Sequence, residues 1–110
     1  MPGYLTTHVL DTAKGRPAAG LEIVLYRLEN GARAEIGRKV TNEDGRTDGP
    51  ILPEADFATG AYELVFRAGG YLDDTGFLGD VPVRFTMSEA AHYHVPLLLS
   101  PYGYSTYRGS

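Results

Sequence analysis

The sequence contains no cysteine, so neither a disulfide framework nor a thiolate metal site can form. It also has no tryptophan and no apolar run near the ~20 residues that a membrane-spanning helix needs. Positive charge is scarce and scattered, because 10 Lys and Arg stand against 14 Asp and Glu and give a formal net charge of -4. Nucleic acids and anionic membranes require a concentrated positive surface, so neither is expected as a partner.

Neither end of the sequence resembles a targeting segment. The first residues lack a basic region followed by a long apolar stretch, which argues against a cleaved signal peptide. The last three residues, Arg108, Gly109 and Ser110, differ from the peroxisomal Ser-Lys-Leu address. We therefore expect an unprocessed, cytoplasmic protein.

The length of 110 residues suits one compact domain. A domain of this size buries only about two-thirds of the surface that its unfolded chain exposes, and it often gains stability by associating with copies of itself. We predict a single domain over residues 1–110 that forms oligomers.

Short runs with alternating Val, Ile, Tyr, Phe and Thr recur along the chain, and Gly, Pro, Asn and Asp separate them. This pattern is typical of an all-β sandwich or barrel. A helix is expected only over residues 68–75, and it should be short because Gly69 and Gly70 disfavour helix. The predicted strands cover residues 4–11, 21–28, 33–41, 61–67, 81–87, 91–99 and 104–108.

Turn residues between these runs predict how the strands connect. Residues 29–31 read Glu-Asn-Gly, which is a hairpin signal, and residues 14–17 and 42–45 contain similar turn formers. We therefore expect the strands on either side of each turn to pair antiparallel. Pro101 should end the sixth strand and start a tight return, so that the last two strands form a hairpin.

Two histidines fall on an outward face of the predicted sandwich. Alternation in the first strand places Val9 in the core and His8 on the opposite face. In the sixth strand the more continuous apolar set should enter the core, which leaves His94 and Leu98 outside. A face that mixes histidines with leucine is too apolar for ordinary solvent, so we expect another subunit to cover it.

The residues alone leave two interpretations of these histidines open. Histidine is common at intermediate burial, so a structural or surface role is the simpler explanation. The alternative is a cleft beneath a second subunit, where imidazoles that titrate near neutral pH transfer protons. A zinc site on His92 and His94 is disfavoured, since cysteine is absent and no nearby carboxylate has ligand spacing.

Arg46 lies in the sequence Asn-Glu-Asp-Gly-Arg-Thr-Asp-Gly-Pro, a loop so rich in turn formers that its backbone path should be well defined. Most arginines are solvent-exposed, and this remains the simpler explanation. A guanidinium on a fixed loop can instead bind a planar anion or an oxyanion through two hydrogen bonds.

Three separated segments resemble a known family: residues 5–12 with 15–18, residues 41–46, and residues 92–110. In this order they are similar to the 5-hydroxyisourate hydrolases of the transthyretin-like family, and the terminal Tyr-Arg-Gly-Ser is the most specific mark. The resemblance covers almost the whole chain. It implies a two-sheet, transthyretin-like β-sandwich of about eight strands with one short helix. It also implies a homotetramer, a dimer of dimers whose central channel holds the sites.

The same resemblance implies a reaction and its residues. The family's catalytic groups match His8, Arg46 and His94, while Tyr107 and Ser110 are expected to bind substrate. The implied reaction is hydrolysis of 5-hydroxyisourate to 2-oxo-4-hydroxy-4-carboxy-5-ureidoimidazoline in urate degradation. Histidine assists water attack on a lactam carbonyl and arginine stabilises the anion. No metal or organic cofactor is implied.

Two other classes remain as alternatives. A carrier on this scaffold would resemble transthyretin itself, which has lysine, glutamate and threonine at the positions of His8, Arg46 and His94. An immunoglobulin-like adhesion module would predict a monomer with a secretion signal. Residues 77–80 depart from the family pattern of an aromatic pair and a proline, and we expect them to lie away from the catalytic face.

Overall fold

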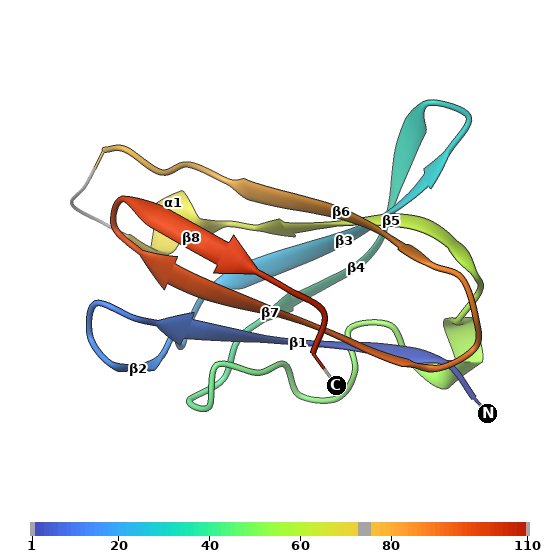
Figure 1. Cartoon of the computed structure of the whole chain (residues 1–110), viewed down its shortest axis with the longest axis horizontal. Coiled ribbons are helices and arrows are strands. Elements are labelled where there is room, and N and C mark those ends of the chain that lie inside the picture. Colours follow the sequence, from blue (N-terminus) through green and yellow to red (C-terminus); the bar gives the residue numbers. More distant parts are fainter. Residues whose placement is uncertain (1, 73–75, 110) are drawn as a thin grey trace.

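Eight strands build two layers in the computed structural model, which describes residues 2–72 and 76–109 (Figure 1). One sheet has the strand order β2-β1-β7-β8, and the other has the order β4-β3-β5-β6. The all-β sandwich predicted from the sequence is confirmed. The first sheet consists of β1 (Tyr4–Asp11), β2 (Arg16–Pro17), β7 (His92–Ser100) and β8 (Gly103–Thr106). The second consists of β3 (Glu22–Glu29), β4 (Ala32–Val40), β5 (Gly60–Phe66) and β6 (Val81–Met87).

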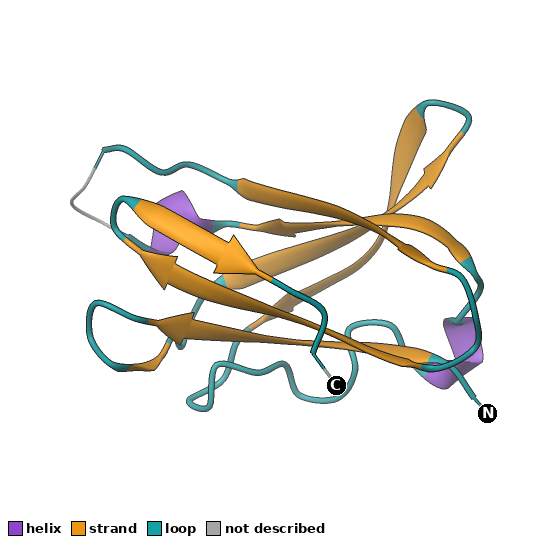
Figure 2. Ribbon diagram, viewed as in Figure 1, coloured by secondary structure: helices purple, strands orange, loops and turns teal. Residues whose placement is uncertain are grey.

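Within residues 2–72 and 76–109, helical structure is limited to two short segments outside the sheets (Figure 2). The 3-10 helix η1 covers Glu54–Asp56, and α1 covers Ala68–Tyr71. The predicted short helix therefore starts where expected, but its last predicted residues, 73–75, lie outside the described residues. No helix in the described ranges is long and apolar enough to cross a membrane.

The predicted strands all form, but their pairing is only partly as expected. The antiparallel hairpins β3–β4 and β7–β8 are confirmed. The turn at residues 14–17 does not pair β1 with β3, which lie in different sheets, and the turn at 42–45 does not pair β4 with β5. Instead, β1 pairs in parallel with β7, from Tyr4 opposite His92 to Asp11 opposite Leu99. A turn reverses the chain locally, whereas burial of both sheets decides which strands become neighbours.

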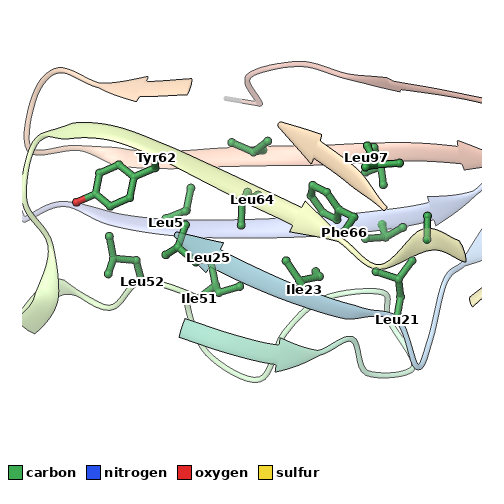
Figure 3. Close-up of a cluster of buried hydrophobic side chains, with 14 of the residues drawn as sticks. Leu5, Leu21, Ile23, Leu25, Ile51, Leu52, Tyr62, Leu64, Phe66 and Leu97 are labelled. Carbon is green, nitrogen blue, oxygen red and sulfur yellow. The ribbon is translucent and has the colours of Figure 1, made fainter. Parts of the chain in front are cut away.

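Inward-facing residues of both sheets form the core between them (Figure 3). Leu5 and Val9 of β1 are fully buried, as the alternation predicts. Leu25 and Phe66 from the second sheet pack in the same cluster, with Ile51 from the loop after β4. Each such side chain contributes about 1.5–3 kcal/mol when fully buried. Because this face of β1 is fixed inward, the alternate residues of the strand must point outward.

Residues 77–80 contact the end of the sandwich near α1. Gly69 donates its N–H to the carbonyl of Gly79 at 3.0 Å, and Asp80 forms an ion pair with Arg67 at 3.0 Å. The ring of Phe77 packs against Tyr102 with centroids 5.9 Å apart. None of these partners lines the cleft described below.

Candidate active site

His8 and His94 point outward from adjacent parallel strands. The register places Thr6 opposite His94 and His8 opposite Pro96, so the histidines are diagonal neighbours on one face of the sheet. Both side chains are partly buried. The charge of a protonated His8 helps to lower the pKa of His94, which puts the two rings within electrostatic range of each other. The predicted outward placement of both histidines is confirmed.

The loop after β4 carries Arg46 to these histidines. This loop runs beside the edge of β1 that does not face β7, where Val9 donates its N–H to the carbonyl of Gly45 at 2.8 Å. His8 and Arg46 form an isolated antiparallel bridge in the same stretch. The three residues predicted as catalytic from separate parts of the sequence therefore lie together.

Asn42 sets the path of this loop. Its side-chain oxygen accepts the N–H groups of Asp44 at 2.9 Å and of Arg46 at 3.2 Å. The backbone N–H of Asn42 donates to the carbonyl of Arg46 at 2.7 Å. An asparagine that binds the backbone two residues onward is a common turn motif, so the Asn-Glu-Asp-Gly sequence indicates the turn but not the role of Asn42 in the site.

Gly45 is a second determinant of the loop, and its replacement gives a stability prediction. Its φ is +74°, and a Cβ there would collide with the carbonyl oxygen of Val9. Gly49 has a φ of +81° but open space around it, so it is a matched control. Gly49→Ala should cost about 1–2 kcal/mol of unfolding free energy from its left-handed backbone. Gly45→Ala should cost at least about 1 kcal/mol more because of the collision.

Urea unfolding monitored by circular dichroism measures both variants. Equal losses of stability in Gly45→Ala and Gly49→Ala would contradict the close packing of the Arg46 loop on β1.

The imidazole of His8 has one unpaired nitrogen. Its Nε2 is buried and has no hydrogen-bond partner in the part of the chain that the structure describes. The ring also hydrogen-bonds the backbone of Asp44, which raises the pKa of His8, so Nδ1 is the atom that makes this bond. Burial and the nearby Arg46 charge outweigh this effect and lower the pKa of His8 below its usual value. The neutral ring with a free lone pair on Nε2 is therefore favoured.

His94 is also favoured in its neutral form. Burial lowers its pKa first, and the positive charges of Arg46, His92 and His8 lower it further. Its Nδ1 lies 2.8 Å from the hydroxyl of Thr6. Two neutral imidazoles beside a permanent cation can exchange protons with a ligand near neutral pH.

A cleft of about 570 Å³ opens on this face of the sheet. Arg46, His94 and Tyr107 are part of its wall, whereas His8, which forms the bridge with Arg46, is not among its lining residues. A smaller recess of about 290 Å³, between β6 and the chain after β8, has mostly apolar walls and no histidine. The chemistry-bearing groups are therefore gathered at the first cleft. Its remaining wall residues are Tyr4, Thr6, Thr7, His92 and Gly109.

The C-terminal tail returns along β7 to this cleft. The last strand was predicted to reach residue 108, but β8 ends at Thr106, whose hydroxyl donates to the carbonyl of Pro96 at 2.7 Å. Arg108 then stacks over the ring of Tyr93, 4.4 Å from its centroid. Strand alternation consequently does not apply to Tyr107, which reaches the cleft by a different route. Ser110, the other predicted substrate-binding residue, lies outside the described residues.

Gly109 packs directly on His94. Its N–H donates to the carbonyl of His94 at 2.7 Å. A Cβ at Gly109 would lie 2.6 Å from Cδ2 of the imidazole, so no larger residue fits without moving the ring. Sequence patterns do not predict this role, although Gly109 stands in the terminal motif that carries the resemblance.

The described residues contain no group of three or more His, Asp or Glu side chains arranged to hold a metal ion. The cleft instead carries the imidazoles of His92 and His94, the guanidinium of Arg46 and two tyrosines on an outer sheet face. Such a site defines a class of small β-sandwich proteins equipped to bind a polar anion and transfer its protons.

Comparison with known proteins shows which family of β-sandwich proteins the chain belongs to. Residues 5–109 match the model of the HIUase/Transthyretin family, and the chain belongs to this family. It is 64% identical to 5-hydroxyisourate hydrolase 2 of Rhizobium meliloti, over 98% of this chain and 97% of that protein. The structure of Klebsiella pneumoniae 5-hydroxyisourate hydrolase superposes with a TM-score of 0.80 at 32% identity, covering 98% of this chain and 94% of that one.

The fold is shared more widely than the site. Sea bream transthyretin in complex with thyroxine superposes with a TM-score of 0.87 at 28% identity, covering 96% of this chain and 93% of that chain. The transthyretin-like fold predicted from the sequence is thus confirmed. A fold common to an enzyme and a hormone-binding protein leaves function to be argued from the side chains.

Proposed function

We propose that this protein hydrolyses 5-hydroxyisourate in urate degradation, by acid–base catalysis with His8, His94 and Arg46. The high identity to 5-hydroxyisourate hydrolases supports the reaction. The observation that carries the mechanism is the buried, unpartnered Nε2 of His8 beside Arg46. A buried polar atom without a partner needs an explanation, and a reacting water molecule provides one.

His8 is the general base in this mechanism. With its Nδ1 proton held by the backbone of Asp44, its Nε2 lone pair takes a proton from water. The resulting hydroxide attacks a lactam carbonyl in the six-membered ring of the substrate. General-base assistance of this kind contributes about 10²–10⁴-fold to a rate.

Arg46 and His94 act on the charges that develop. 5-Hydroxyisourate is a flat, readily deprotonated bicycle, and the Arg46 guanidinium binds the anion and the oxyanion formed by attack through charge-assisted hydrogen bonds. His94 gives a proton to the lactam nitrogen of the substrate as the bond between this nitrogen and the carbonyl carbon breaks. Tyr107 and Ser110 position the substrate, and the product is 2-oxo-4-hydroxy-4-carboxy-5-ureidoimidazoline.

We also infer that the working form is a homotetramer. Leu10 and Leu98 are paired in register on the outer face beside the histidines, and both are only partly buried within one chain. A second subunit packed on this face would bury the leucines and close the cleft. Closed twofold symmetry then gives a dimer of dimers with sites shared between subunits.

The function is tested by generating 5-hydroxyisourate from urate with urate oxidase and following its ultraviolet absorbance. A catalytic amount of the protein should speed the decay well above the spontaneous rate. A carrier on the same scaffold would bind a ligand and leave the decay unchanged.

The pH dependence of kcat/KM should follow the neutral histidines. Protonating His8 removes its lone pair, so activity falls on the acid side. Since burial and Arg46 lower the pKa of His8, the midpoint of this limb should lie below the ordinary histidine value of about 6.5. Initial rates between pH 5 and 8, corrected for titration of the substrate, give the midpoint. A profile without an acid limb through this range would remove histidine as the base.

Gly109→Ala should slow catalysis while leaving the fold intact. The added methyl group would push the His94 imidazole from its position, and a displacement on the order of 1 Å can cost about 10²-fold in rate. We expect kcat to fall at least about 10-fold. Gly79→Ala, where nothing lies within 4 Å of the new Cβ, is the control and should keep the original kcat. Equal kcat in both variants, in proteins of equal thermal stability, would refute the positioning role.

A further inference from the structure

One hydroxyl joins two histidines on the outer face of the β1–β7 pair. Oγ1 of Thr6 lies 2.7 Å from Nε2 of His92 and 2.8 Å from Nδ1 of His94. A hydroxyl has a single proton, so it donates to one of these nitrogens and accepts from the other. The protonation site of each imidazole is therefore tied to that of the other.

The three side chains lie along one wall of the cleft, from partly buried His94 to exposed His92. His94, at the inner end, is partly buried, lines the same cleft as Arg46 and lies against the backbone of Gly109. His92, at the outer end, is exposed, and its ring stacks on Tyr4 with centroids 4.2 Å apart and planes 6° apart. The stacking and the Thr6 hydrogen bond together fix the ring of His92, which is exposed within a single chain.

We propose that Thr6 and His92 form a proton relay that supplies His94 with the proton it gives to the leaving nitrogen. This inference rests on the proposed hydrolysis, in which His94 is the acid. It assigns roles to two residues outside the predicted catalytic set of His8, Arg46 and His94.

The proton transfers in the relay balance, because each proton that leaves one atom is received by the next. The relay acts from the imidazolium form of His92, whose Nε2–H donates to Thr6. The Thr6 hydroxyl donates to Nδ1 of His94, and His94 holds its proton on Nε2. As Nε2 of His94 protonates the leaving nitrogen, the Thr6 proton moves to Nδ1 of His94 and the Nε2 proton of His92 moves to Thr6. Both histidines end neutral with hydrogen on Nδ1. The starting state returns when Nε2 of His94 takes a proton from water, the Nδ1 proton of His94 returns to Thr6, and the Thr6 proton returns to Nε2 of His92.

This order explains why the hydroxyl lies where it does. Without a proton arriving at Nδ1, a neutral His94 that gave up its Nε2 proton would become an imidazolate, which is a high-energy species. Both heavy-atom distances are within the usual range of hydrogen bonds, so transfer along the chain requires no movement of the strands.

Thr6→Val removes the hydroxyl and keeps the branched shape, whereas Thr6→Ser keeps the hydroxyl and removes the methyl group. We expect Thr6→Val to lower kcat at least about 10-fold with KM changed less than about 3-fold, because the lost step follows binding. Thr6→Ser should recover most of the loss. His92→Phe, which retains a ring to stack on Tyr4 but cannot donate, should lower kcat like Thr6→Val.

Imidazole ¹⁵N chemical shifts give a readout that does not depend on activity. In the free protein the neutral His94 should carry its proton on Nε2, and Thr6→Val should shift this tautomer balance toward Nδ1–H. Thr12→Val is the matched control, because the Thr12 hydroxyl donates to the carbonyl of Leu99 and should leave both kcat and the His94 shifts unchanged.

The outcomes separate the relay from the proposed reaction. Inactive wild-type protein would overturn the reaction and the relay with it, whatever the nitrogen shifts. Active wild-type protein with an unaltered kcat or unaltered His94 shifts in Thr6→Val would overturn the relay alone. The same holds if Thr6→Ser is as slow as Thr6→Val, since Thr6 would then act through its methyl group. A fall in kcat restored by serine, together with the tautomer shift, supports the relay.

Discussion

Replacement of His8 or His94 by alanine, or of Arg46 by glutamate, is expected to lower kcat/KM at least about 100-fold. Each variant removes a proton carrier or reverses the charge that binds the anion. The fold should survive, because all three side chains point away from the core between the sheets. Substrate decay measures the kinetic loss, and circular dichroism with thermal unfolding measures stability.

Arg16→Glu is the control for the charge reversal at Arg46. Arg16 lies exposed on β2 and does not line the cleft, so its variant should keep nearly the original kcat/KM. Losses of less than a few-fold in all three site variants would refute the proposed site. A similar loss in Arg16→Glu would instead point to a general effect of net charge.

The second large effect concerns assembly, and Leu98→Glu is expected to convert the proposed tetramer into inactive dimers. Leu98 pairs with Leu10 on the outer face beside the histidines. A carboxylate there would be buried unpaired against the facing subunit, which costs several kcal/mol. Each cleft would also lose its opposite wall, so activity should fall with the tetramer. Analytical ultracentrifugation and the decay assay, run on the same sample, measure both effects.

Val40→Glu is the matched control for this change. Val40 is an apolar residue at the end of β4, 55% exposed, on the other sheet, and its substitution should leave the tetramer intact. Dimers of Leu98→Glu with full activity would overturn the shared site, even if the catalytic residues proved correct. A wild-type protein that sediments as a monomer would overturn the tetramer itself.

Local sequence patterns predicted the elements and the faces of the strands well. Alternation in β1 was enough to separate buried Val9 from outward His8, because the period of a strand is fixed by its backbone geometry. The Asn-Gly turn between β3 and β4 likewise formed as expected, with positive φ at both Asn30 and Gly31. These features depend on a few neighbouring residues and need no knowledge of the rest of the chain.

Long-range features were not accessible from such patterns. The parallel pairing of β1 with β7 joins residues more than 80 positions apart, and no local signal specifies it. That pairing is what brings Thr6 between His92 and His94, so the linking hydroxyl could be found only in the structure. The packing of Gly109 on His94 is hidden for the same reason, since it depends on the tail leaving strand geometry after Thr106.

The position of Arg46 depends on both local sequence patterns and long-range contacts. The turn-rich loop predicted a well-defined backbone, and Asn42 and Gly45 now account for it. Nothing in that loop indicates where the guanidinium lies, because its position depends on the bridge with His8. The family resemblance predicts that Arg46 lies with His8 and His94, which the turn-rich loop alone does not.

The most direct test of the account is the decay of 5-hydroxyisourate across a series of protein concentrations. Urate oxidase would generate the substrate in the cuvette, and the absorbance would be followed with wild-type protein, with His8→Ala and without either. Catalysis predicts a decay rate that rises in proportion to wild-type protein at amounts far below the substrate, while His8→Ala stays near the spontaneous rate. A wild-type rate equal to the spontaneous rate at every concentration would contradict the assignment of this protein as a hydrolase.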